Sequence, residues 1–193
     1  MNVQVADLSD ATLAEAAARL SPGKKLNLSA CGVESVELST LPDCIESLSI
    51  RGKEYLDVHI TLDPACRIEQ LSALNYRSVT LSGSTGDLPK TFGAYWCQKL
   101  PLPEPFNARR LEKLTATGHH DMSAAICTLA ESPDLVEVSL DTPSMSAATL
   151  EVLLACPNLQ TVRISGLSIP FSLFETWGDA FEDRILFGLP IDL

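Results

Sequence analysis

The chain has 193 residues, of which 46% are hydrophobic and 20% charged, a composition that excludes intrinsic disorder as its main state. Its net charge is −11 and its basic residues are scattered, which disfavours binding to nucleic acid or to an anionic membrane surface. No uncharged run approaches the roughly 20 apolar residues of a membrane span. Acidic residues stand where a secretory signal has basic ones, so we expect a cytoplasmic protein, or one injected into a host cell without a classical signal peptide.

The first expected element is an amphipathic helix over residues 9–20. Ser9 has the side chain of a good N-cap residue, and an apolar stripe follows at Leu13, Ala17 and Leu20. A Ser-Pro-Gly sequence comes next and ends the helix. Residues 1–22 are therefore interpreted as an N-terminal helical cap, which a stack of repeats needs at its end.

Residues 23–100 contain short repeats of a string whose first, fourth and sixth positions are apolar. The string begins at Ile45 (IESLSI) and at Ile68 (IEQLSA), 23 residues apart, and KKLNLSAC places an earlier copy 22 residues before Ile45. A weaker match, FGAYWC, begins at Phe92. The fourth and sixth positions share one face of a strand, because side chains alternate along a strand. One such strand does not bury its apolar face alone, so stacked neighbours are expected.

A second series of strings is interleaved with the first in this half of the chain. It consists of VESVEL at Val33, YLDVHI at Tyr55 and YRSVTL at Tyr76. The gaps of 8 to 13 residues that contain these strings leave no room for helices. The first half is therefore predicted to form two strands per turn, with extended segments on the convex side.

A proline-rich stretch, residues 101–110, interrupts the repeats. Pro101, Pro103 and Pro105 favour an extended backbone there. The stretch is interpreted either as a loop that joins two styles of repeat or as a proline-rich ligand for a partner groove.

Residues 111–167 repeat with a strict period. The string recurs as LEKLTA, LVEVSL and LQTVRI, and successive copies begin 24 residues apart. Equal spacing places equivalent positions of neighbouring strands in register. The sequence therefore predicts that Leu114, Val138 and Val162 stack one above another inside a single core.

The linkers of this second half have helical patterns. MSAAICTLA follows Asp121 and MSAATLEVLLAC follows Ser144, so a capping side chain precedes each expected helix. Residues 168–193 are rich in aromatic side chains and are interpreted as a C-terminal cap. A helix over residues 170–181 would close the core, and RILFGLPIDL would add a last strand.

The strings LVEVSL, LQTVRI, IESLSI and VESVEL resemble the leucine-rich repeat superfamily over roughly residues 20–170. CPNLQTVRISGL is similar to the cysteine-containing and ribonuclease-inhibitor-like subclasses. The resemblance implies an α/β fold: a right-handed solenoid with a parallel concave sheet and with convex helices mainly in the C-terminal half, formed by residues 1–193 as one domain. The Asn or Cys that the family usually has after the sixth position occurs only as Cys31, so irregular curvature is expected.

The candidate site is the concave face of the predicted sheet. Its outward positions are mostly Ser and Thr, which leave room for a partner, although such residues also suit any solvated strand. The residues expected to contact a partner are Ser49, Arg51, Ser72, Thr115, Glu137, Ser139, Asp141 and Arg163. Tyr95, Trp96 and Trp177 are candidates either for an interface or for the core.

These features favour a non-catalytic protein–protein interaction module without cofactor or metal, monomeric when alone. The acidic charge favours a protein partner with a basic patch. By resemblance, bacterial effectors and substrate-selecting adaptors are the relevant classes of protein.

Two other functions remain open at this stage. One is a metal- or thiol-dependent enzyme that uses His119, His120 and a cysteine, although two adjacent histidines fall short of the four ligands typical of a zinc site. The other is a self-associating structural subunit. The six cysteines are spread over the chain without a CxxC pair, so they are interpreted as reduced and structural.

Overall fold

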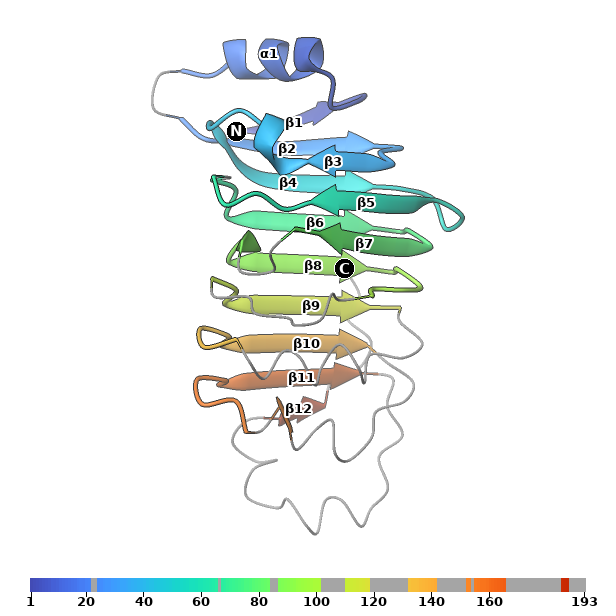
Figure 1. Ribbon diagram of the computed structural model, residues 1–193, viewed down its shortest axis with the longest axis vertical. Coiled ribbons are helices and arrows are strands. Elements are labelled where there is room, and N and C mark those ends of the chain that lie inside the picture. Colours follow the sequence, from blue (N-terminus) through green and yellow to red (C-terminus); the bar gives the residue numbers. More distant parts are fainter. Residues whose placement is uncertain are drawn as a thin grey trace.

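The computed structural model describes residues 1–21, 24–65, 67–83, 87–101, 110–118, 132–141, 152–153, 155–165 and 185–187. These residues form a parallel β-solenoid, in which successive coils of the chain stack along one axis (Figure 1). The described part is mostly strand, and it contains one α-helix, α1 (Asp10–Ala18), together with a 3₁₀ turn, η1 (Leu38–Thr40). Neither described helix is long and apolar enough to cross a membrane.

Two parallel sheets make up the described solenoid. The first has nine strands, which stack in chain order: β1 (Asn2–Val5), β2 (Leu26–Cys31), β4 (Ile45–Arg51), β6 (Gln70–Leu74), β8 (Thr91–Tyr95), β9 (Lys113–Thr117), β10 (Glu137–Asp141), β11 (Thr161–Ser165) and β12 (Ile185–Phe187). The second has three: β3 (Ser35–Glu37), β5 (Asp57–Thr61) and β7 (Ser78–Ser82). From β2 to β8 the chain alternates between the two sheets, which confirms the prediction of two strands per turn (Figure 1).

The core lies between the sheets and continues along the inner side of the larger one. Every second residue of each strand points inward, as the alternation of apolar residues predicts. Leu114 pairs with Val138, Val138 pairs with Val162, and all three side chains are fully buried. The predicted stack is therefore confirmed.

Two predicted registers are wrong. Phe92 lies beside Leu71 and not beside Ile68, so it is the fourth position of its string and not the first. Leu28 lies beside Leu48, whereas the spacing placed Leu26 there; an irregularity between Leu26 and Asn27 accommodates the difference. This second error amounts to two residues, and a slip of two keeps the same side chains on the same face.

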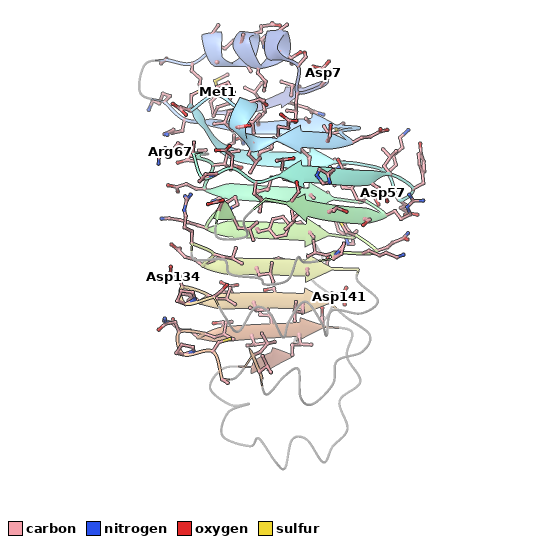
Figure 2. The ribbon with its side chains drawn as sticks, viewed as in Figure 1. Met1, Asp7, Asp57, Arg67, Asp134 and Asp141 are labelled. Carbon is pink, nitrogen blue, oxygen red and sulfur yellow. The ribbon has the colours of Figure 1, made fainter. Side chains whose placement is uncertain are left out.

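The N-terminal cap differs in detail from the expected one. Helix α1 is shorter than residues 9–20, and the Ser9 hydroxyl does not cap it. Instead, the backbone N–H and the hydroxyl of Ser9 both donate to Asp7 Oδ1, at 3.0 and 2.6 Å, beside the start of α1 (Figure 2). These hydrogen bonds lower the pKa of Asp7. Leu13 and Ala16 are the buried residues of α1, whereas the expected stripe had Ala17 in place of Ala16.

Several expected elements lie outside the described residues. They include the helix after Asp121, nearly all of the helix after Ser144, and the closing helix over residues 170–181. The described part therefore shows the coiled parallel sheets but not the α/β class with convex helices: its one complete α-helix, α1, covers the end of the stack (Figure 1), and of the expected convex helices only Val152 and Leu153 are described, both helical. The expected last strand is present as β12.

Candidate partner-binding face

The outer face is the side of the nine-stranded sheet that points away from the core. Because strand side chains alternate, each strand contributes two or three residues to it. The strand register joins Ser49, Ser72, Gly93, Thr115, Ser139 and Arg163 into one line that crosses six strands. Five of the eight predicted contact residues thus lie in a single row, which we call the central row.

The other three predicted residues flank the central row. Asp141 lies at the end of β10 (Figure 2), beside Thr117. Glu137 lies between Lys113 and Thr161, and Arg51 lies beside Leu74. The structure therefore places all eight on one face. Accessibility is uneven, however: Arg51 and Arg163 are exposed, whereas Ser139 is only 6% exposed.

A hollow of about 440 Å³ marks the outer face near the helical cap. Its polar lining consists of uncharged amides and hydroxyls, contributed by Asn2, Gln4, Asn27, Ser29, Ser47 and Ser49. Asn27 Nδ2 donates to Asn2 Oδ1 at 3.0 Å, so two of the amides are already paired with each other. Sequence reasoning missed Asn2 and Gln4, because β1 was not predicted; the alternation of Val3 and Val5 was the available signal.

Glu137 joins two cations on the outer face. Its carboxylate lies 2.9 Å from Lys113 Nζ and 3.6 Å from Arg163 Nε, and the Glu137 side chain is 27% exposed. Two residues expected to contact a partner are therefore paired with each other. With Arg51 and Asp141 included, the outward strand positions carry three cations and two carboxylates, so the negative charge of the chain is not concentrated here.

The two described aromatic candidates lie at the end of β8 and not in the core. Tyr95 is half-buried on the outer face, and the Trp96 side chain is 48% exposed in the turn that follows. Trp177 lies outside the described residues.

The exposed side of the three-stranded sheet carries a hydroxyl network. His59 Nε2 and Ser82 Oγ are 2.8 Å apart, and the Ser82 hydroxyl donates to Thr61 Oγ1 at 3.3 Å. The network links His59, Ser82 and Thr61 of two neighbouring strands, β5 and β7. Beside the network, the ion pair with Arg77 lowers the pKa of Asp57.

The described residues hold no group of three potential metal ligands among His, Cys, Asp and Glu. His119 and His120, on which the enzyme alternative depends, lie outside them. The described cysteines are free thiols: Cys31, Cys44, Cys97 and Cys156. Burial raises the pKa of Cys97 to about 11 and raises that of Cys156, and both shifts disfavour the reactive thiolate.

Comparisons of the chain with protein-family models, with curated proteins and with solved structures find no match. The parallel β-solenoid is thus established by strand pairing. A function for the chain has to come from the chemistry of its surfaces.

Proposed function

We propose that this chain is a non-catalytic protein–protein interaction module of the leucine-rich repeat type, which binds another protein on its outer face. The central row carries this proposal. From Ser49 to Ser139 it contains no side chain larger than threonine, and its accessible hydroxyls are those of Ser49, Ser72 and Thr115, since the Tyr95 ring covers Gly93 and Ser139 is buried. A partner segment laid along the row can pack against the sheet on either side of the Tyr95 ring and find these hydroxyl groups for hydrogen bonds.

Charge acts at two ranges in this proposal. The net charge of −11 attracts a basic partner over long distances and raises the rate of encounter. At contact, the outer face presents both cations and carboxylates, and Glu137 is already paired with Lys113 and Arg163. Local fit along the central row then determines which partner stays bound. A monomeric effector or adaptor in a cytoplasm is the setting that this module suits.

The experiment compares bulky substitutions on the two sheets. Ser72→Arg and Thr115→Arg place long side chains on the central row, and Thr80→Arg places the same side chain at a half-buried outward position of β7. A partner captured by the wild-type chain is purified, and its affinity for each variant is measured by calorimetry after circular dichroism has confirmed folding. We expect at least about tenfold weaker binding for Ser72→Arg and Thr115→Arg.

The control variant Thr80→Arg is expected to bind like the wild type. Equal affinities for all variants, or a loss confined to Thr80→Arg, would contradict binding at the outer face.

A further inference from the structure

Four of the turns that leave the nine-stranded sheet have a residue in the left-handed backbone conformation directly after the strand, and one of these residues is unexpected. Gly32, Asn75 and Gly118 follow β2, β6 and β9 with φ values of 70°, 59° and 84°. Glycine and asparagine adopt this left-handed conformation most readily. At the equivalent place after β8, Trp96 has φ 51°. A bulky side chain is disfavoured in this region of backbone space.

Contacts with the next coil fix the conformation of Trp96. In earlier coils the backbone N–H of the residue after the strand donates to a carbonyl oxygen of the next coil. The N–H of Gly52 donates to the Leu74 oxygen at 2.9 Å, and the N–H of Asn75 donates to the Tyr95 oxygen at 2.8 Å. The N–H of Trp96 instead donates to the Thr117 hydroxyl, at 2.9 Å. A Cβ at Gly118 would lie 2.9 Å from the Trp96 Cα.

The indole of Trp96 is accessible to a partner. Nearly half of its surface is exposed. Strained residues concentrate at functional sites, where the surrounding structure holds them in place. Tryptophan is also one of the residues most enriched at the energetic centres of interfaces.

Two apolar side chains lie at the edge of the outer face close to Trp96 in the chain or the sheet: Tyr95, which precedes it, and Leu74, which pairs with Tyr95 on β6. The ring of Tyr95 lies back over Gly93, where any Cβ would overlap it, so the ring lies against the sheet. Leu74 lies beside Tyr95, and Arg51 lies beside Leu74 on the next strand. Among the described side chains, Arg51 makes no ion pair, so its guanidinium donors remain available to a partner.

We propose that Arg51, Leu74, Tyr95 and Trp96 form an anchor patch for a partner-protein segment that carries a carboxylate side chain close to an apolar one. This inference rests on the proposed function, since it names the central contact of the same face. The apolar side chain packs against Leu74, Tyr95 and Trp96, and the carboxylate accepts two hydrogen bonds from Arg51. Two strand spacings separate Arg51 from Tyr95, about 10 Å, which one short segment spans.

A peptide pair tests the chemistry of the patch. The probe is acetyl-Ser-Glu-Ala-Leu-Ser-amide, and its control replaces Glu by Gln without a change of shape. Nuclear magnetic resonance of the ¹⁵N-labelled chain is expected to show saturable shifts at Leu74, Tyr95 and the Trp96 indole. The Glu peptide should bind about fivefold more tightly than the Gln peptide, because a charged acceptor strengthens the bonds to Arg51. Arg51→Gln should remove this difference.

The variant Trp96→Gly separates binding from folding. It removes the ring and supplies the residue best suited to the left-handed turn, so peptide binding should be lost while circular dichroism shows a folded chain. Asn75→Gly is the matched control at the equivalent turn, and it should leave peptide binding unchanged. The anchor patch is refuted by equal shifts with both peptides, by the absence of shifts, or by unchanged peptide binding in a folded Trp96→Gly variant.

Binding of the full partner protein to these variants distinguishes failure of this inference from failure of the proposed function. Retained partner binding in Trp96→Gly and Arg51→Gln, together with its loss in Ser72→Arg, would place the contact on the central row and overturn the anchor patch alone. Retention in all of these variants would overturn both.

Discussion

The ring of Tyr76 fills the space that a side chain at position 52 would need, so Gly52 and Tyr76 pack as one unit across neighbouring coils. A Cβ on Gly52 would overlap three carbon atoms of the ring. Tyr76 is fully buried, and its hydroxyl donates to the carbonyl oxygen of Val33 at 2.8 Å. The ring therefore links three successive turns that leave the larger sheet.

This packing predicts a strong coupling between the two positions. We expect Gly52→Ala to lower the free energy of unfolding by about 1–3 kcal/mol through overpacking. Combined with Tyr76→Leu, which makes room for the methyl group, the same change should be much less destabilising. A double-mutant cycle in urea measures this coupling. Gly32→Ala is the control, because a Cβ there meets no atom within 4 Å, so additive effects of Gly32→Ala and Tyr76→Leu are expected.

The stacked core predicts a sharp contrast between adjacent residues of β9. Leu114 is fully buried between Phe92 and Val138, whereas Thr115 points to the outer face. Leu114→Ala should lower the free energy of unfolding by about 2–5 kcal/mol, since it leaves a cavity. Thr115→Ala should change it by no more than about 0.5 kcal/mol. Similar losses in urea denaturation for both variants would show that the register of β9 is wrong.

Burial of Cys97 predicts a loss of stability at alkaline pH. The pKa of this thiol rises from 9.0 to about 11 on folding, because burial penalises the thiolate. The folded chain keeps the proton that the unfolded chain releases, so the stabilisation is complete below pH 9 and is lost as pH rises through 11. Burial also raises the pKa of Tyr76, which acts in the same direction at higher pH.

Urea denaturation at pH 8, 9.5 and 11 measures this effect. Cys97→Ala should have a shallower fall in the free energy of unfolding over this range than the wild type. Cys31→Ala, at an exposed position, should keep the wild-type dependence. Parallel curves for the wild type and Cys97→Ala would rule out a role for this thiol.

The ion pairs of Glu137 predict a small effect that depends on salt. Lys113 and Arg163 are about half exposed, so water screens both pairs, and Glu137→Gln should lower the free energy of unfolding by less than about 1 kcal/mol. The loss should largely disappear in 1 M NaCl, where the Debye length is about 3 Å. Thermal unfolding at low and high salt provides the measurement. A loss that persists in high salt would mean that packing of Glu137, and not its charge, is responsible.

The sequence carried enough information to predict the stacking and the outward side chains. The 24-residue period placed Leu114, Val138 and Val162 correctly, because equal spacing between copies leaves one consistent register. Strand alternation then determined which residues point outward, including the central row. The same two facts also place Lys113, Glu137 and Arg163 on adjacent strands, so their ion pairs were within reach of sequence reasoning.

Other features depend on contacts that the sequence pattern does not encode. Strands β2 and β4 are offset by two residues from the predicted register. Because apolar residues alternate along a strand with a period of two, a shift of two residues leaves the apolar pattern unchanged, so the pattern does not reveal it. The left-handed backbone of Trp96 is held by Thr117 and Gly118 of the next coil, so no local preference of Trp96 predicts it. For the same reason, the anchor patch emerges only once neighbouring strands are paired.

Helix α1 also has a consequence for assembly. A parallel stack of coils can continue from one molecule to the next. The apolar interior of an uncovered end coil can pack against a neighbouring molecule in the same way as it packs against the adjacent coil of its own chain. Leu13 and Ala16 of α1 close that interior at the β1 end, and the outer side of the helix carries charged residues such as Glu15 and Arg19. The helix therefore opposes end-to-end polymerisation into fibres through this end of the molecule.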